Sequence, residues 1–327
     1  MKLVVPLLAV LVIALALGGC RGTAATPQAL VPAGASLLGE ARVADILKDA
    51  DLARLYNRAS KGESLPETLD DLLALSAKKT GMDLRQVQTI LFFADIDEKS
   101  EYAGAIAKGA FDESQLMAVL GNHSNREFAP QQYKKHRLLV DASEDPPTAF
   151  TLLSKDTLVL GTLPAVQAVV DVAEGDQAAL AGGLKESFDA LGQPLFRMAL
   201  EVPPEALSSK DSPLNDLSQV PGGLGGTMPG LEAMRALQVV AMSLDKNGQG
   251  IKASANLDFA GADSADEVGS LADGALALMR SFSPNEQMRA VLKKIKIDVA
   301  GPRVTVAAQA TVAELEALAK NGLPSGF

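Results

Sequence analysis

The sequence predicts an α+β protein made of two tandem, diverged units of mainly antiparallel sheet, with helices packed on one face of each sheet. Three observations lead to this prediction. Short segments in which apolar and polar residues alternate are joined by short turns, which is typical of antiparallel strands. Segments with helical periodicity and capping residues lie between these strands. Finally, a stretch of the first half recurs in the second half with the same order of elements.

The first unit is expected to cover residues 36–190. Its best-signalled helix has Ser64 and Glu67 at the positions of a capping box, Pro66 in the first turn and Gly81 after the end. The expected strands are 36–43, 87–96, 102–111, 134–141, 148–153 and 157–161. The expected helices are 44–59, 65–79, 113–120, 163–174 and a linking helix at about 177–190.

The second unit is expected to cover residues 191–327 and to contain a Gly/Pro-rich loop at 208–230. Thr311 and Glu314 form a capping box at the start of its last helix. The expected strands are 195–202, 237–245, 250–259, 294–300 and 303–310. The expected helices are about 230–236, 263–281, 285–293 and 311–321.

An internal repeat connects the two units. Residues 97–111 and 245–259 each start with an acidic residue, continue as an alternating strand and reach phenylalanine after the same number of steps. The offset is 148 residues (245 minus 97), and it also relates the strands that precede these segments. Thr162 and Thr311 lie at an offset of 149 residues (311 minus 162), each where a helix is expected to begin. We therefore expect residues 87–175 and 235–322 to share one fold, although alanine- and valine-rich strands can also resemble each other by chance.

The N-terminus has the pattern of an export signal. Lys2 precedes an unbroken apolar run from Leu3 to Leu17, which is shorter than the roughly 20 residues that a membrane-spanning helix needs. The run ends in Leu17-Gly18-Gly19-Cys20, which resembles the lipobox of bacterial lipoprotein precursors. The resemblance implies a signal peptide at 1–19, cleavage before Cys20 and acylation of the Cys20 thiol, with a palmitate-type chain among the lipids. An uncleaved helical anchor is the alternative.

Cys20 is the only cysteine of the chain, so a disulfide or a cysteine-based metal site within one molecule is excluded. Residues 20–35 are expected to form the lipidated cysteine and a flexible tether. Lipoproteins kept in the inner membrane often have aspartate after the cysteine, whereas this chain has Arg21. The resemblance therefore implies the outer membrane, facing the periplasm, if the cell has two membranes. The mature part also resembles uncharacterised repeat-containing envelope lipoproteins.

Composition and histidine placement argue against several classes of function. The formal net charge of −10 disfavours nucleic acid as a partner, and the lack of tryptophan disfavours a sugar-stacking face. The two histidines, His123 and His136, have no partner at metal-ligand spacing, and no Gly-x-Ser-x-Gly elbow is present. Both are expected to be solvated surface residues. We therefore expect no enzyme, no cofactor and no metal site, and a hydrolase that uses one of these histidines is the least favoured reading.

Two apolar segments are candidates for binding. The loop residues Gly222, Gly223, Leu224, Gly225, Gly226 and Met228 could form a mobile lip that touches a ligand or partner, or belong to a disordered insertion. The helix around 265–279 could line a groove, although core packing is the default for its apolar residues. The sequence thus favours a non-enzymatic, membrane-anchored envelope lipoprotein with a binding or scaffolding role. The alternative is a carrier that holds a lipid or other hydrophobic ligand between sheet and helices.

Overall fold

The structure, a computed structural model, describes residues 26–60, 66–80, 83–96, 101–114, 116, 128–208, 232–283 and 286–320. The chain forms two compact units that divide between Gly182 and Gly183. This division precedes the expected boundary at 190/191, because α7 (Gly183–Ala190) packs on the strands of the second unit. The Ser187 hydroxyl in α7 donates a hydrogen bond to Asp258 Oδ2 at 2.6 Å in a strand of that unit. The residues at 177–182, which were expected to be helical, are not.

The described part of the first unit contains an antiparallel sheet in the order β1-β2-β3-β7-β6-β5-β4. Its strands are β1 (Leu37–Ala41), β2 (Val87–Ala94), β3 (Ala103–Gly109), β4 (Phe128–Tyr133), β5 (His136–Asp141), β6 (Thr148–Ser154) and β7 (Thr157–Thr162). Five of the expected strands are confirmed, with a sixth shortened to begin at His136. The strand β4 was not expected. It contains Pro130, which suits the edge position that the strand order gives it.

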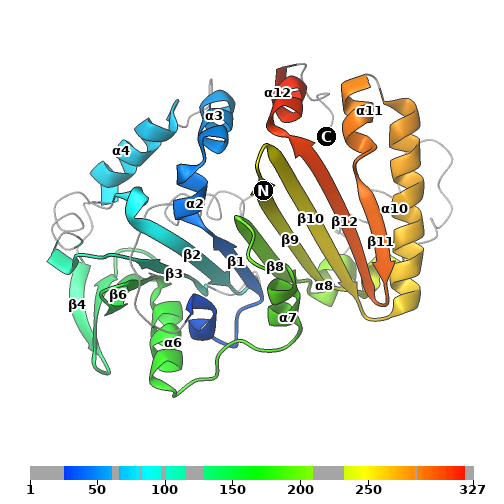
Figure 1. Cartoon of the computed structure of the whole chain (residues 1–327). Coiled ribbons are helices and arrows are strands. Elements are labelled where there is room, and N and C mark those ends of the chain that lie inside the picture. The colour runs from blue at the N-terminus through cyan, green and yellow to red at the C-terminus, as the bar shows by residue number, and fades with distance from the viewer. Residues whose placement is uncertain are drawn as a thin grey trace. The chain divides into compact units, whose positions relative to one another are not determined.

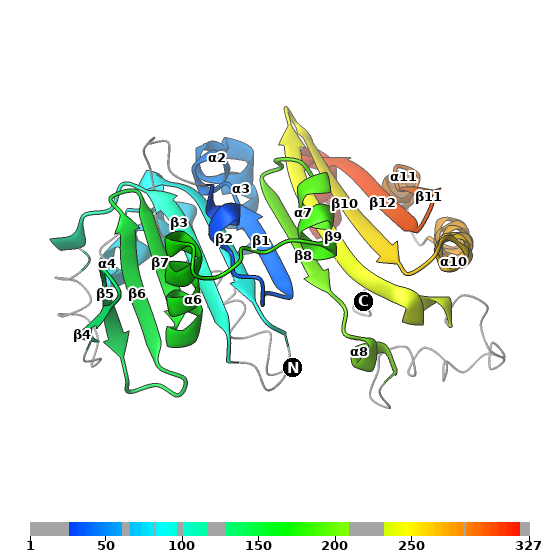
Figure 2. The ribbon, with the colours of Figure 1, turned by 90° about the horizontal axis from the view of Figure 1, so that it is seen from below.

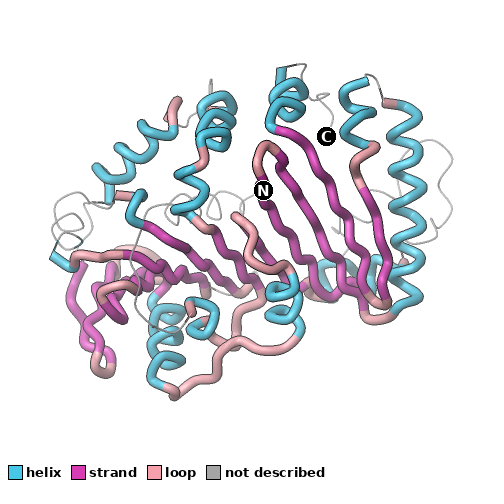
Figure 3. The backbone as a smooth tube through the Cα atoms, viewed as in Figure 1, coloured by secondary structure: helices cyan, strands magenta, loops and turns pink. Residues whose placement is uncertain are grey.

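The described part of the second unit has an antiparallel sheet in the order β11-β12-β10-β9-β8. The strands are β8 (Phe196–Glu201), β9 (Leu237–Asn247), β10 (Gly250–Phe259), β11 (Lys296–Ala300) and β12 (Arg303–Thr311). All five were expected, within one or two residues at each end. Figure 3 shows the long strands of this unit beside its helices. The structure therefore confirms the α+β class and the mainly antiparallel pairing.

In the first unit, helices cover both faces of the sheet. One face carries α2 (Val43–Lys48), α3 (Ala50–Ala59) and α4 (Leu69–Thr80), and the other carries α6 (Leu163–Glu174) (Figures 1 and 2). Val166, Val169 and Val170 of α6 are fully buried. The structure thus adds a second helical layer to the single layer that the sequence predicted.

The helices near the start of the first unit differ from the expected ones because other side chains cap them. The expected helix 44–59 is two helices, since the Asp49 side chain accepts hydrogen bonds from the backbone N–H groups of Asp51 and Leu52 and so starts α3. The helix α4 begins after Thr68, whose hydroxyl accepts from Asp71 N at 3.0 Å. Ser64 and Gly81 lie outside the described residues. Most of the helix expected at 113–120 also does.

In the second unit, one face of the sheet carries α10 (Ala262–Phe282), α11 (Glu286–Leu292) and α12 (Val312–Lys320). The other face carries α7, which contacts β8 and β9 (Figure 1). Two short helices, α8 (Pro204–Ser208) and η3 (Ala233–Ala236), contact each other. The core lies under the N-terminal half of α10, where Ala265 and Val268 pack with Phe259 and Val304.

The segment just before the first strand is not a flexible tether. Residues Pro27–Leu30 form a 3-10 helix, η1, and Val31 is fully buried. The backbone N–H of Leu180 donates to the Val31 carbonyl at 2.7 Å, and Gln28 Nε2 donates to Glu40 Oε1 at 2.7 Å. The tether expected at 20–35 is therefore wrong from residue 26 onward, because buried apolar residues hold this part on the first unit.

Five strands of the first unit have the same order as the five described strands of the second, and β4 and β5 are additional. Within each unit, β1-β2-β3-β7-β6 and β8-β9-β10-β12-β11 have identical connectivity and pairing directions. Both central hairpins also contain one register shift near their start, which leaves Gln88 of β2 and Gln238 of β9 as the extra residue. These shifts set the structural offset of the hairpins at 150 residues (238 minus 88), not 148. Phe259 therefore matches Gly109, so the expected equivalence of Phe111 and Phe259 is wrong, although a difference of two residues keeps the alternation of faces in step.

The last helices of the two units depart from the expected repeat. Thr162 and Thr311 each precede a helix, but only Thr311 caps it: its hydroxyl accepts from Glu314 N at 3.2 Å, and Thr311 N donates to Glu314 Oε2 at 2.8 Å. The Thr162 hydroxyl instead contacts backbone atoms of Ala103. Gly104 of β3 and Ser254 of β10 are equivalent at the offset of the hairpins, 150 residues (254 minus 104). Gly104 pairs with Gly161 of β7, and Ser254 pairs with Ala307 of β12. The last strands therefore match at an offset of 146 residues (307 minus 161).

At that offset β12 continues three residues further than β7 before its helix begins. An odd number of residues reverses the face from which the chain leaves a sheet. Accordingly, α6 lies opposite α2–α4, whereas α12 packs beside α11 on the same face as α10. The prediction that both final helices lie on the same face of the repeated fold is wrong.

Candidate binding surfaces

Most of the predicted site residues cannot be placed. Cys20 lies outside the described residues, and so do the loop residues Gly222, Gly223, Leu224, Gly225, Gly226 and Met228. His123 does as well. In the described ranges, no group of three or more His, Cys, Asp or Glu side chains could hold a metal ion. Likewise, no helix of the described chain is long and apolar enough to cross a bilayer.

His136 is not the solvated residue that the sequence predicted. Its side chain is 10% exposed, and its Nε2 lies 3.0 Å from Glu174 Oε1 near the end of α6. Lys135 pairs with the same carboxylate at 3.0 Å, and Tyr133 donates a hydrogen bond to Asp171 at 3.1 Å. The hydrogen bond from His136 and the charge of Lys135 lower the pKa of Glu174. Together these contacts fasten the β4–β5 turn to α6, which is a structural role.

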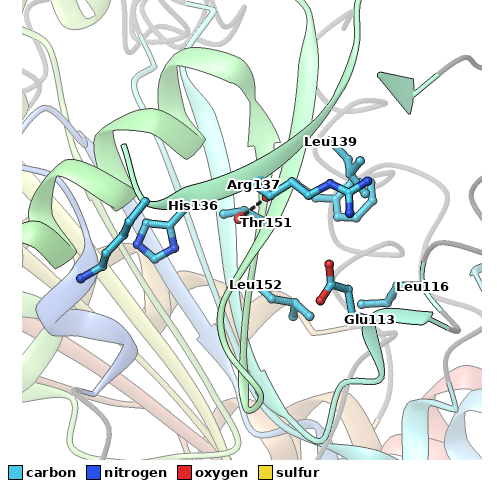
Figure 4. A pocket seen from close by; sticks show the side chains of 9 residues that line it. Glu113, Leu116, His136, Arg137, Leu139, Thr151 and Leu152 are labelled. Carbon is cyan, nitrogen blue, oxygen red and sulfur yellow. Dashed lines mark hydrogen bonds between the residues drawn. The ribbon is translucent and has the colours of Figure 1, made fainter. Parts of the chain in front are cut away.

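A cavity of about 200 Å³ lies between β5, β6 and the segment that begins at Glu113 (Figure 4). Its lining combines the apolar Leu116, Leu139 and Phe150 with the polar Glu113, Arg137 and Thr151 (Figure 4). The Thr151 hydroxyl donates a hydrogen bond to the Arg137 carbonyl at 2.9 Å. Pockets for small molecules usually measure about 300–1,000 Å³, so this cavity is too small to enclose a lipid.

The apolar face of the second sheet is only partly covered. Phe196 and Met198 of β8 pair with Leu244 and Met242 of β9, and their side chains lie on the face that carries α10. On this face the contacts of α10 are with β10, β11, β12 and η3, at the other side of the sheet. Met242 is 37% exposed and Leu244 is 39% exposed. Met242 and Leu244 therefore form an exposed apolar surface together with the partly buried Phe196 and Met198, here called the β8–β9 apolar face.

A second apolar surface lies at the C-terminal end of α10. Leu278, Met279 and Phe282 are 60%, 42% and 80% exposed, and these three residues are here called the α10 tip. The sequence favoured core packing for this helix. That prediction holds for Val268, which is 4% exposed, but not for Leu278 and Met279. A single stripe of apolar residues could not be divided into a buried and an exposed part without knowing that α10 extends beyond the core.

Comparisons with known proteins identify no relative at the level of sequence. No family model matches the chain, and no curated protein matches it. Among solved structures, crystal form III of TP0453 aligns with a TM-score of 0.49 and 8% identity, over 92% of this chain and 100% of the other. Crystal form IV aligns with a TM-score of 0.48 and 10% identity, over 90% and 96% of the two chains. Crystal form I aligns with a TM-score of 0.47 and 10% identity, over 91% of this chain and 98% of the other. These similarities carry no argument about function.

Proposed function

We propose that the protein is a non-enzymatic lipoprotein of the bacterial envelope, held to a membrane by acylated Cys20, with a binding or scaffolding role. The observation that carries this proposal is the order of features at the N-terminus: a charged start, a short apolar run, and the lipobox-like Leu17-Gly18-Gly19-Cys20. The absence of any second cysteine supports it, because an exported chain with one thiol needs a use for that thiol. Two surfaces with exposed apolar side chains, the β8–β9 apolar face and the α10 tip, support a binding role.

The anchor is tested by replacing the nucleophilic thiol. Cys20→Ser is expected to abolish incorporation of labelled palmitate and to leave the precursor uncut. Globomycin, which blocks the lipoprotein signal peptidase, is expected to make the acylated precursor of the unaltered chain accumulate. Processing of the precursor and its attachment to lipid are measured by gel mobility and by partitioning into a detergent phase. A Cys20→Ser chain that is processed normally and still follows the membrane fraction would rule out the anchor.

A second function, carrier of a lipid or other hydrophobic ligand, is favoured by the β8–β9 apolar face. Its exposed side chains, with the neighbouring small residues Ala253 and Ala255, give a flat apolar strip on which an acyl chain could lie. Such a chain would remove Met242 and Leu244 from water, and each methylene that it buries contributes about 0.8 kcal/mol. The support for this function is the accessibility of the strip.

The carrier function is tested by mass spectrometry of protein purified under mild conditions, with Met242→Gln/Leu244→Gln compared with the unaltered chain. Lys252→Gln is the matched control, because Lys252 is exposed on the opposite face of the same sheet. A lipid that co-purifies with the unaltered chain and the control, but not with the double variant, is the expected result. If all three preparations carry the same lipid, or none carries any, this face does not hold a ligand.

A further inference from the structure

The α10 tip is the most water-exposed group of large apolar side chains in the described part of the chain. Phe282 alone leaves 80% of its surface in contact with water. The spacing of Leu271, Ala275, Leu278 and Phe282 is four, three and four residues, so these residues form one stripe along the helix. This stripe is separate from the stripe that packs on the sheet, which contains Ala265, Val268 and Leu276. Ala275, Leu278 and Phe282 are exposed whereas Leu271 is partly buried, so the end of this second stripe has no packing role in the core.

The chemistry around the α10 tip is that of a surface which enters a lipid interface. Between Gly274 and Phe282 the only charged residue is Arg280. Its guanidinium group is turned toward the end of the unit, where Nε donates to the Leu292 carbonyl at 3.1 Å and Nη2 to the Ile295 carbonyl at 2.9 Å. The charge therefore lies beside the stripe and not within it.

A second cation lies at the end of the same helix. Arg289 Nη2 donates to the carbonyl of Ser283 at 3.3 Å, which places its guanidinium group one residue from Phe282. Lys293, also exposed, follows α11. Apolar and aromatic side chains with flanking Arg and Lys are the combination that enters the boundary between headgroups and acyl chains, where the cations attract anionic lipids. Glu286, also exposed at the start of α11, offsets one of these charges. Arg280, Arg289 and Lys293 leave this end net positive, so it complements an anionic bilayer although the chain as a whole is acidic.

We propose that the α10 tip inserts into the interfacial region of a bilayer that contains anionic phospholipid. The inference rests on the proposed anchor, which keeps the bilayer within reach. Because the anchor makes the contact intramolecular, even a small apolar surface is sufficient to form it. The acidic remainder of the chain is repelled by the same lipids, so the contact is confined to this end.

The lone cysteine makes a direct test possible. In the acylated protein Cys20 has no free thiol, so Phe282→Cys introduces a single site for an environment-sensitive fluorophore. Ala277→Cys is the matched control, since it is exposed on the same stretch of helix and lies about 140° around the helix axis from Phe282. The full-length lipidated chains are reconstituted into vesicles of phosphatidylcholine and phosphatidylglycerol, and nitroxide-bearing phospholipid is added as a quencher. The label at 282 is expected to lose most of its fluorescence, whereas the label at 277 keeps most of it.

Each other outcome has a defined meaning. Equal quenching at the two positions, or none at either, overturns the insertion. At high protein density alone, the label at 282 could be shielded from aqueous iodide without being quenched by the nitroxide lipid. That result would mean that a second copy of the chain covers the α10 tip, and it would also overturn the insertion. If the parent chain without an added cysteine takes up the fluorophore, Cys20 is not acylated and the anchor fails. This last result is distinct from the result that rejects the insertion.

Discussion

At the scale of single residues, Asp258 links three elements of the second unit. Its carboxylate accepts hydrogen bonds from Arg303 Nε at 2.5 Å and Nη2 at 3.0 Å, and from the Ser187 hydroxyl at 2.6 Å. These contacts join α7, β10 and β12. Asp258→Ala is expected to lower the free energy of unfolding by about 1–3 kcal/mol, because it leaves a partly buried guanidinium group without its partner.

The measurement for Asp258 is urea denaturation followed by circular dichroism. Asp298→Asn is the matched control, since Asp298 is an exposed residue on the neighbouring strand β11. The control is expected to unfold at the urea concentration of the unaltered chain. If Asp258→Ala does so as well, the network does not stabilise the unit.

Asp156 makes stability depend on pH in the first unit. A hydrogen bond from the Ser154 hydroxyl, and also the charge of Lys108 at 3.6 Å, lower the pKa of Asp156 below its ordinary value of 3.8. The folded state thus favours the charged carboxylate. Its contribution to stability is complete above the ordinary pKa and is lost as the pH falls through the lowered value.

Asp156→Asn tests this linkage. The difference in free energy of unfolding between the unaltered chain and the variant is expected to be largest at pH 7 and to narrow between pH 5 and pH 3. Urea titrations at these pH values measure it. A difference that stays constant across this range would mean that the carboxylate charge does not matter.

At the scale of elements, α10 contains two glycines that should respond in opposite ways to the same substitution. A Cβ atom at Gly269 would lie 2.3 Å from Val299 Cγ2, whereas a Cβ at Gly274 would meet nothing within 4 Å. Gly274→Ala is expected to raise the free energy of unfolding by up to about 1 kcal/mol through helix propensity. Gly269→Ala has the same gain in helix propensity, but overpacking against Val299 is expected to lower its free energy of unfolding by more, about 1–3 kcal/mol.

The two alanine variants are compared by thermal unfolding, so each serves as the control of the other. The expected order of melting temperatures is Gly274→Ala above the unaltered chain and Gly269→Ala below it. If Gly269→Ala is the more stable of the two, α10 does not pack closely against β11.

The helices and strands could be predicted where apolar periodicity and an end signal coincide. The bounds of α6 agree with the prediction because Gly175, in the left-handed conformation with φ of 83°, ends the helix. The prediction of one helix at 44–59 is wrong, because the Asp49 side chain caps α3 and divides the segment into two helices. The strand β4 was missed since Pro130 interrupts its pattern. In both places a single residue outweighs the periodicity.

The candidate surfaces were less predictable than the elements. Met242 and Leu244 alternate with Ser243 and Asp245 in the way that core residues of a strand do, and only the extent of helical cover decides that they are accessible. The same holds for the α10 tip. The spacing of Leu271, Ala275, Leu278 and Phe282 beside the buried stripe was the signal available in the sequence. His136 was misread because its partner, Glu174, is 38 residues away (174 minus 136).

At the scale of the whole molecule, burial is unevenly divided between the two units. Among the described residues, nine of the eleven largest fully buried side chains belong to the first unit, and the other two, Leu184 and Phe188, belong to α7. Helices cover both faces of the first sheet, whereas in the described part of the second unit α7 reaches only β8, β9 and the Asp258 end of β10 on the face opposite α10. Backbone hydrogen bonds in a sheet that is covered on both sides open less readily.

Hydrogen exchange measured by mass spectrometry should show this difference. Amides of β2, β3 and β7 are expected to exchange more slowly than amides of β10 and β12 in the same sample. Because both sets come from one chain, each is an internal control for the other. Equal protection of the two sets would mean that the chain unfolds as a single cooperative unit.

The three additional residues of β12 imply a rule for how such a chain can change during evolution. Insertions or deletions of an even number of residues in a strand leave the following helix on its original face, and odd ones move it to the other side of the sheet. If the two units arose by duplication, one odd change after the duplication would have been enough to transfer the last helix. It would thereby have left one sheet face of the second unit more open to solvent than its counterpart, and free to acquire a role that the first unit does not have.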